Sequence, residues 1–289
     1  MATEFTQFKG TKDYIAATEL KNSVNIAINL GRPLLIKGEP GTGKTMLAKS
    51  IAEDLGLNLI IWSVKSTTKA KEGLYMYDTV QRLYDSQFGD RDVSNISNYI
   101  KLGRLGEAFT SEQTSVLLID EIDKADLEFP NDLLWELDIM NFYIPETKET
   151  VSARNRPIVI ITSNAEKELP DAFLRRCIFH YIDFPDAVMM EEIIKVHHPH
   201  LEKTIMEKAI QAFYNLRNIS GLQKKPSTSE LLDWVQALVI GGAKPHQIVH
   251  DVPFMGVLIK KNEDIDKVKR QLDIQAGRKP ASTGSSFGF

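Results

Sequence analysis

The sequence predicts an α/β protein in which a parallel sheet carries helices on both faces and a small all-helical domain follows. Five short, almost continuously apolar runs alternate with helical patterns up to Phe184, as expected for parallel strands that are buried on both faces. From Pro185 onwards only helical patterns remain. A glycine-rich stretch, GEPGTGKT, lies between the first apolar run and the next helix, where α/β folds commonly hold phosphate groups.

The elements are expected in a regular order. A helix with an imperfect apolar stripe runs from Thr18 and ends at Gly31, and a second begins at Lys44 and stops at Gly56, since glycine readily ends a helix. The five predicted strands are residues 32–38, 58–64, 115–121, 157–164 and 178–184. Further helices are predicted at residues 68–87, 101–112, 132–140 and 170–177, with a hairpin at 141–156.

The change of pattern predicts the domain boundaries. Residues 1–185 would form the α/β domain and residues 186–242 the helical domain, with helices at 187–198, 202–218 and 228–242. Residues 243–275 are then a C-terminal extension, and residues 276–289 are expected to be a disordered tail because they are rich in Gly, Ser and Pro. Two interpretations of DVPFMGVLIKK remain open: a hook onto a neighbouring molecule, or core of the same chain.

Composition narrows the classes of partner. The chain has 289 residues, 43% of them hydrophobic, and a net charge of −4, so no global positive field would hold nucleic acid or an anionic membrane. Its single cysteine, Cys177, is expected to be buried and fits a reducing compartment. The N-terminal residues do not read as a secretory signal, and no apolar run approaches the roughly 18–20 residues of a spanning helix. We therefore expect a cytoplasmic protein without a membrane partner.

The glycine-rich stretch fits the phosphate-loop pattern G-x-x-x-x-G-K-[ST], and it lies between a strand and a helix as the mechanism requires. Its backbone N–H groups would face phosphate oxygens, Lys44 would neutralise them, and Thr45 would ligate Mg²⁺. The predicted nucleotide-binding residues are Gly38, Glu39, Pro40, Gly41, Thr42, Gly43, Lys44, Thr45 and Met46.

Two other strands deliver polar side chains to the same edge of the sheet. After the run VLLI, Asp120 is predicted to hold Mg²⁺ and Glu121 to act as a base for attacking water. After IVII come Thr162 and Asn164, and Asn164 is a candidate for binding phosphate or that water. Exposed surface acids and an ordinary turn asparagine are the alternatives. Asp123 is expected to cap the following helix.

These motifs, in this order, resemble the AAA+ ATPases over about Thr18–Leu238, and GEPGTGKT, LLIDEIDKAD, IVIITSN and LPDAFLRR together look like the MoxR branch. The resemblance implies a P-loop AAA+ sandwich with a helical lid, bound ATP and Mg²⁺, and a homo-oligomer, most commonly a hexamer. It also implies that Arg176 reaches the site of a neighbouring subunit. Arg175 stands where the pattern has Asp, and both arginines are candidate catalytic residues.

The lid departs from the branch. The branch carries an arginine at the start of a late lid helix, and Ser229 occupies the aligned position here. Lys224 or Lys225 could substitute for it. Tyr75 and Tyr77 are candidates for gripping a polypeptide in a central pore, against the alternative that both rings pack beneath a helix.

MoxR-type ATPases commonly work with a von Willebrand factor A domain protein as chaperones for a metalloenzyme or complex, so the resemblance implies such a partner and an unidentified client. Two other function classes stay open. One is a nucleic-acid-dependent motor, such as a helicase, clamp-loading or restriction-type ATPase, although KSTTKAKEG is the only modest basic run. The other is a small-molecule kinase, which would need an acceptor pocket and no arginine from a neighbour.

Overall fold

A computed structural model of the protein describes residues 7–89 and 92–275. Within these residues the chain forms two compact units, one containing residues up to 39 and residues 43–184, and the other containing residues 40–42 and those from 185 onwards. The first unit has the predicted five-stranded parallel sheet, and the second is entirely helical. The predicted fold class is therefore confirmed.

The sheet has the strand order β2-β5-β8-β1-β9, and every neighbouring pair is parallel. Its strands are β1 (Leu34–Gly38), β2 (Asn58–Ser63), β5 (Ser115–Asp120), β8 (Ile158–Ser163) and β9 (Ile178–Ile182). Because β5, β8 and β1 are adjacent and parallel, their carboxyl ends lie at one edge of the sheet. This edge is where polar residues that follow the strands can meet.

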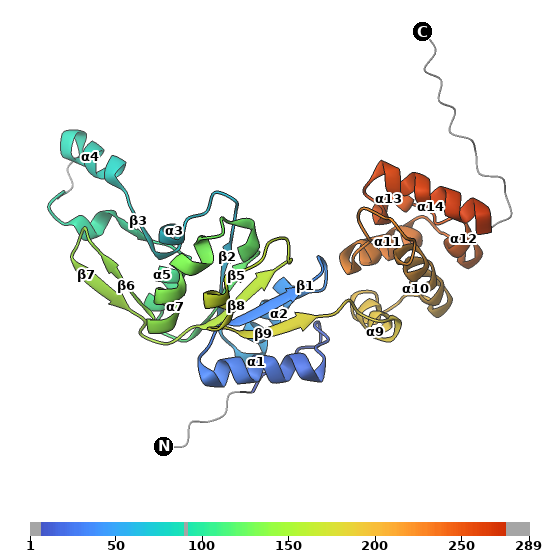
Figure 1. Cartoon of the computed structure of the whole chain (residues 1–289), viewed down its shortest axis with the longest axis horizontal. Coiled ribbons are helices and arrows are strands. Elements are labelled where there is room, and N and C mark those ends of the chain that lie inside the picture. Colours follow the sequence, from blue (N-terminus) through green and yellow to red (C-terminus); the bar gives the residue numbers. More distant parts are fainter. Residues whose placement is uncertain (1–6, 90–91, 276–289) are drawn as a thin grey trace, which may run out of the picture. The chain divides into compact units, whose positions relative to one another are not determined.

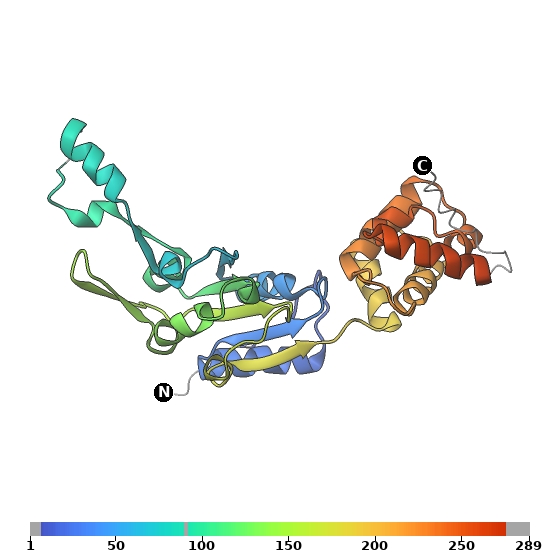
Figure 2. The same ribbon diagram turned by 45° about the horizontal axis from the view of Figure 1, so that its top comes forward.

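Helices α1 (Thr18–Leu30) and α2 (Lys44–Leu55) cover one face of the sheet (Figures 1 and 2). Their buried side chains pack with alternate residues of the strands, including Leu34 and Ile36. The intervening Leu35 points to the opposite face and packs into a second core. Alternation of this kind along a strand shows that both faces of the sheet are buried.

The second core contains aromatic and aliphatic side chains from several short helices. These are α5 (Arg104–Thr110), α6 (Phe129–Asp132), α7 (Leu134–Ile139) and α8 (Asp171–Leu174), as well as a 3-10 turn, η2 (Ile122–Lys124). Trp62 of β2 makes an edge contact with Phe129, the two ring centroids lying 5.4 Å apart. The helices predicted at 132–140 and 170–177 are thus present, but each is only one to two turns long.

The prediction of a single helix at residues 68–87 is wrong. The chain instead forms α3 (Ala70–Leu74), β3 (Tyr75–Tyr77) and α4 (Thr79–Phe88), and β3 pairs antiparallel with β4 (Ile100–Leu102), which follows η1 (Ile96–Tyr99). Two local features explain the break. Tyr75 is buried and stacks on Phe142, and Asp78 starts a new helix by accepting the backbone N–H of Gln81.

The hairpin predicted at 141–156 is confirmed as β6 (Asn141–Ile144) and β7 (Glu149–Ser152). It projects from the same end of the α/β unit as the segment from α3 to β4 (Figures 1 and 2). The Tyr75 hydroxyl donates to Glu146 Oε2 at 2.8 Å, in the turn of the hairpin. The two projecting segments are therefore joined by a stacked ring pair and a hydrogen bond.

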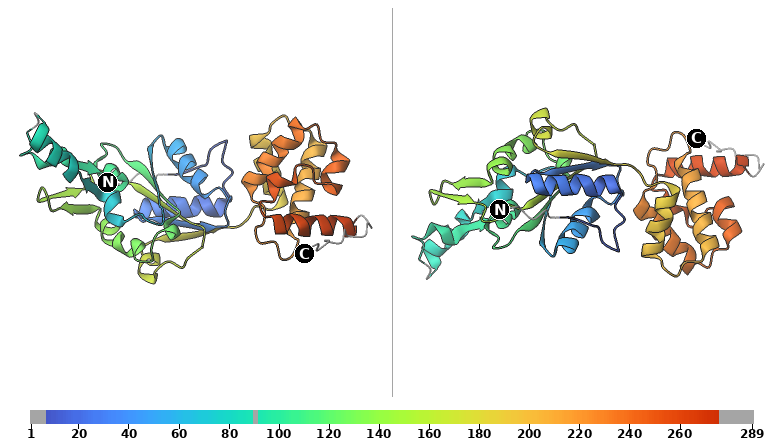
Figure 3. Two further views of the ribbon diagram at one scale, coloured as in Figure 1. Left: turned by 90° about the horizontal axis from the view of Figure 1, so that it is seen from above. Right: turned by 90° about the horizontal axis from the view of Figure 1, so that it is seen from below.

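The helical unit contains six helices among its described residues (Figure 3). They are α9 (Ala187–His197), α10 (Lys203–Arg217), α11 (Thr228–Ile240), α12 (Pro245–His250), α13 (Met255–Leu258) and α14 (Asn262–Gln275). Within DVPFMGVLIKK, Val252, Leu258 and Ile259 are buried, as in the interpretation that places this segment in the core of its own chain. The predicted disordered tail, residues 276–289, lies outside the described residues.

Candidate nucleotide-binding site

The glycine-rich loop joins the end of β1 to the first turn of α2. Gly41 and Gly43 have φ angles of 79° and 83°, which side-chain-bearing residues rarely adopt, and a Cβ at Gly43 would lie 3.1 Å from Cε2 of Tyr14. Gly43 is the N-cap of α2 and offers no side chain to the first N–H groups of the helix. These donors and the positive end of the helix dipole suit an anion.

The Lys44 side chain is folded over this loop. Its Nζ donates to the backbone oxygens of Gly38 at 2.8 Å and Glu39 at 2.9 Å, so two of its three N–H donors are used. Burial lowers the pKa of Lys44 below its ordinary value, against the opposing effect of nearby acids, first Asp123 and then Asp120. A buried ammonium with a depressed pKa would gain stability from an additional anionic partner.

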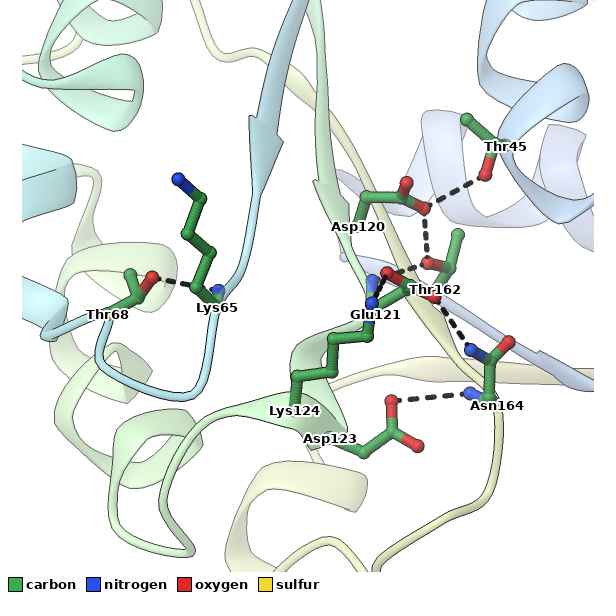
Figure 4. Close-up of polar contacts among 9 residues, drawn as sticks. All are labelled: Thr45, Lys65, Thr68, Asp120, Glu121, Asp123, Lys124, Thr162 and Asn164. Carbon is green, nitrogen blue, oxygen red and sulfur yellow. Dashed lines mark hydrogen bonds and ion pairs between the residues drawn. The ribbon is translucent and has the colours of Figure 1, made fainter.

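Asp120 is the acceptor for hydroxyl groups from two different elements (Figure 4). Its Oδ1 accepts from Thr45 Oγ1 of α2 at 3.0 Å and from Thr162 Oγ1 of β8 at 2.7 Å. The parallel pairing of β5 with β8 places Thr162 beside the end of β5. The two predicted metal-binding residues, Thr45 and Asp120, are thus in direct contact.

Glu121 follows β5 with φ 59° and ψ 52°, a left-handed backbone conformation. Its backbone N–H donates to Thr162 Oγ1 at 2.8 Å, so this one hydroxyl joins the backbone of Glu121 to the carboxylate of Asp120. The Glu121 carboxylate accepts from Asn164 Nδ2 at 2.8 Å and pairs with Lys124. The pKa of Lys124 is raised, first by its hydrogen bond to Glu121.

Asp123 does not cap the helix that follows it, and that expectation is wrong. Its buried carboxylate accepts the backbone N–H of Asn164 at 3.3 Å (Figure 4). It also accepts the backbone N–H of Glu166 at 2.9 Å, and so fixes the loop after β8. Sequence reasoning also missed the role of Thr162 as a bridge. The available signal was a hydroxyl residue at the buried end of an apolar strand next to an acidic one.

The two candidate arginines lie between α8 and β9, and both are exposed. Arg176 Nε pairs with the Asp138 carboxylate of α7, and Arg176 Nη1 donates to the backbone oxygen of Ala172 at 3.0 Å. Within the described residues no such contact is recorded for the Arg175 side chain. Neither of these contacts joins Arg176 to the hydrogen-bond network of Asp120 and Glu121.

The remaining candidates are held by other contacts. Tyr75 is buried and cannot grip a polypeptide, while the half-buried Tyr77 accepts a hydrogen bond from Arg82 Nη1. In the helical unit Lys224 pairs with Glu230 at 2.8 Å, and both Lys225 and Ser229 are exposed. The interpretation that a ring packs inside the fold thus holds for Tyr75.

Cys177 is buried as expected, and burial, followed by the charge of Asp138, raises the pKa of its thiol to about 12. Over the described ranges, no cluster of histidine, cysteine or acidic side chains is arranged to hold a metal ion. Across those same ranges, no helix has the length and apolar character needed to cross a membrane.

The comparison with protein families decides the family. The model of the ATPase family associated with various cellular activities (AAA) matches residues 34–185, which is just over half of the chain. The chain belongs to this AAA family. The match begins at β1 and ends where β9 leads into the helical unit, so it spans the sheet and the whole polar cluster at its carboxyl edge.

Several curated proteins are similar at low identity. The uncharacterized AAA domain-containing protein ycf46 of Pyropia yezoensis is 27% identical over 217 residues, covering 73% of this chain and 38% of the relative. The chaperone protein ClpB of Malacoplasma penetrans is 33% identical over 157 residues, covering 52% of this chain and 20% of ClpB. Midasin of Giardia intestinalis is 28% identical over 179 residues, covering 58% of this chain and 3% of Midasin. The chain therefore spans less than half the length of these relatives.

The residues of this AAA domain fit ATP and Mg²⁺, which AAA ATPases typically bind. The glycine cradle and the open N-terminus of α2 suit phosphate groups, and Lys44 supplies positive charge. Thr45 and Asp120 supply the oxygen ligands that Mg²⁺ prefers. The fit rests on the geometry of one sheet edge and one loop.

Proposed function

We propose that the protein is a Mg²⁺-dependent ATPase that works as a ring and remodels or activates a partner protein. One observation carries the catalytic part of this proposal. The Asp120 carboxylate accepts hydrogen bonds from hydroxyl groups of α2 and β8, while the adjacent Glu121 carboxylate is oriented by a hydrogen bond from Asn164. The carboxylate proposed to bind the metal ion, Asp120, and the one proposed to activate water, Glu121, are therefore adjacent, and each is held by its own hydrogen-bond donors.

Each residue of the site has a defined part in this proposal. Lys44 and the N–H groups at the start of α2 bind and orient phosphate groups, and Thr45 and Asp120 hold the metal ion. Glu121 takes a proton from the attacking water, and Asn164 keeps its carboxylate in position. When bound, Mg²⁺ neutralises charge that develops on the phosphate oxygens.

The ring in this proposal follows from Arg176. Its recorded contacts are with Asp138 and Ala172 rather than with the polar cluster, as expected for a group that serves a neighbouring molecule. A guanidinium group supplied by a neighbour contributes about 10³–10⁵-fold to turnover in other NTPases where it has been measured. We infer a homo-oligomer, with the hexamer as the expected form.

The work done by the ring is the less constrained part of the proposal. Motifs of the MoxR branch favour a chaperone-like ATPase with a von Willebrand factor A domain partner, and the name of the similar ClpB protein describes it as a chaperone. The two joined projections, one from α3 to β4 and the other β6–β7, are candidate client-binding elements. The client stays unidentified.

ATP turnover per subunit tests the assembly. It should rise with protein concentration, fall strongly in Glu121→Gln and Arg176→Ala, and leave ATP binding by these variants intact. Lys44→Ala should lose binding itself. A flat concentration dependence down to the monomer range, or unchanged turnover in Arg176→Ala, would count against shared sites.

Client capture tests the remodelling part. Glu121→Gln, which should bind ATP without hydrolysing it, is used as bait in native cells, with Lys44→Ala as the matched control. Enrichment of a von Willebrand factor A domain protein or a metalloenzyme supports the proposal. Enrichment of DNA-processing subunits, together with DNA-stimulated turnover at physiological salt, would replace it with a nucleic-acid motor.

A further inference from the structure

We propose that Asp138 is a positioning residue that holds Arg176 in the orientation needed for a neighbouring subunit. The inference rests on the proposed function, because it concerns how the arginine of the shared site is prepared. Asp138 lies on α7, and Arg176 follows α8, so the pair joins two elements that both pack on the same face of the sheet. No sequence motif predicts a role for Asp138 or its pairing with Arg176.

The hydrogen-bond count of the guanidinium group carries the argument. An arginine side chain has five N–H donors. Arg176 uses the one on Nε for Asp138 and one on Nη1 for the Ala172 backbone oxygen. For the described residues the structure records no partner for Nη2, so three donors stay available while the group is held at two points.

Exposure is consistent with this arrangement. The side chains of Arg176 and Asp138 are 44% and 43% exposed, so the pair lies at the surface, where isolated ion pairs contribute little to stability. Its effect would instead be to restrict the rotamers of a long side chain before a ligand arrives. Such restriction lowers the entropy lost when the remaining donors bind an anion.

Arg175 provides an internal comparison. It is the adjacent residue and is also exposed, but no contact of its side chain is recorded within the described part of the chain. Among the residues that the structure describes, Arg176 is the one of the two candidate arginines whose side chain already has partners. The geometry thus assigns the shared role to Arg176, with Asp138 and the Ala172 carbonyl as its support.

The first test needs no nucleotide. In protein with ¹⁵N-labelled arginine, the Arg176 Nε–H signal should exchange slowly with solvent. Asp138→Ala should make its exchange fast, and Asp138→Glu should restore part of the protection. A signal that is unchanged in Asp138→Ala would overturn the proposed support.

The second test asks which subunit needs Asp138. Arg176→Ala subunits keep a nucleotide site and lack the arginine, whereas Lys44→Ala subunits lack nucleotide and keep the arginine. A mixture of the two should regain turnover if sites are shared. Adding Asp138→Ala to the Lys44→Ala subunits should then lower the regained kcat roughly tenfold or more, with little change in KM. Adding Asp138→Ala to the Arg176→Ala subunits should leave the regained kcat unchanged.

Glu107→Ala is the matched control, since it removes the Arg104–Glu107 ion pair, in which Glu107 is 41% exposed. It should leave the mixture unaffected in either subunit. Equal effects of Asp138→Ala in both subunits, no effect in either, or a rise in turnover would overturn the inference. If mixed assemblies form and the parent mixture regains no turnover, the shared site itself is wrong. The exchange rate of the Arg176 signal separates that failure from a failure of Asp138 as support.

Discussion

Thr162 is the residue that joins the two acids of the candidate site. Its side chain is fully buried, its hydroxyl donates to Asp120, and the same oxygen accepts the backbone N–H of Glu121. It therefore fixes the position of the carboxylate that would hold the metal ion and the backbone of the residue that would activate water.

Thr162→Val keeps the shape of this side chain and removes its hydroxyl. Because the part-buried N–H of Glu121 then loses its partner and Asp120 Oδ1 keeps only the hydroxyl of Thr45, we expect the free energy of unfolding to fall by about 1–3 kcal/mol. ATP turnover should fall more than ATP binding. Denaturant unfolding and steady-state kinetics measure the two effects.

Thr162→Ser is the control, because it returns the hydroxyl and should recover most of both losses. A valine variant as stable and as active as the wild-type protein would show that the bridge contributes nothing.

Sequence patterns predicted the positions of the site residues better than their contacts. Asp120, Glu121 and Asn164 could be placed at one edge because each follows an apolar run that must be a parallel strand. The bridge through Thr162 depends on the register between β5 and β8, and no local pattern encodes that register. The pairing of Arg176 with Asp138 joins residues 38 positions apart and was equally inaccessible.

Among the elements, the segment from α3 to β4 and the hairpin β6–β7 depend on each other. Tyr75 is 3% exposed, its ring stacks on Phe142 with centroids 6.1 Å apart, and its hydroxyl donates to Glu146. Burial, and then Glu146, raise the pKa of Tyr75 to about 12, so the phenol remains a donor across the physiological range. A single side chain thus connects two projections that are distant in sequence.

Tyr75→Phe should cost about 0.5–1.5 kcal/mol of unfolding free energy, since it removes one hydrogen bond and keeps the stacked ring. Combined with Glu146→Ala in a double-mutant cycle, it should give a coupling energy of similar size. Chemical denaturation of the four proteins measures both quantities.

Tyr143 offers a matched control on the same hairpin, because its side chain is 54% exposed and Tyr143→Phe should change stability very little. If the cycle gives no coupling, the two projections are independent of each other.

Regular elements were predictable and the projecting segment was not. The five strands and the first three helices of the second unit, α9, α10 and α11, have strong apolar periodicity, which the structure follows. The helices α12, α13 and α14 were not predicted. Residues 68–87 have helical composition, but burial of Tyr75 against Phe142 comes from a hairpin more than 60 residues further along the chain. Tertiary contacts of this kind override local propensity, and they also moved Asp123 from the predicted cap to a brace for the loop after β8.

At the scale of the whole molecule, the last described helix, α14, fixes a loop of the helical unit. Asp264 of α14 is fully buried, and its carboxylate accepts the backbone N–H groups of Gln223 at 2.9 Å and Lys224 at 3.0 Å. Burial raises its pKa, but these hydrogen bonds and Lys267 outweigh burial, so the net pKa is below the ordinary value. The C-terminal extension therefore holds the loop that precedes α11.

The sign of this shift predicts an acid response. The unfolded chain binds a proton at Asp264 more readily, so its stabilising contribution is present above about pH 4 and is lost as pH falls through the lower folded-state pKa. Asp264→Asn should flatten this part of the stability profile. Asp264→Ala should speed hydrogen exchange at the amides of Gln223 and Lys224. Wild-type exchange rates in Asp264→Ala would contradict the role of α14.

The left-handed backbone at Glu121 is expected to lower the stability of the α/β unit. That conformation costs a side-chain-bearing residue about 1–2 kcal/mol, and asparagine tolerates it better than most. Glu121→Asn should therefore unfold at higher denaturant than Glu121→Gln, although neither carboxamide can accept the proton of water. An equal midpoint would show that the strain is absent. In a directed-evolution experiment that rewards only resistance to unfolding, the proposed catalytic base would be among the first residues replaced.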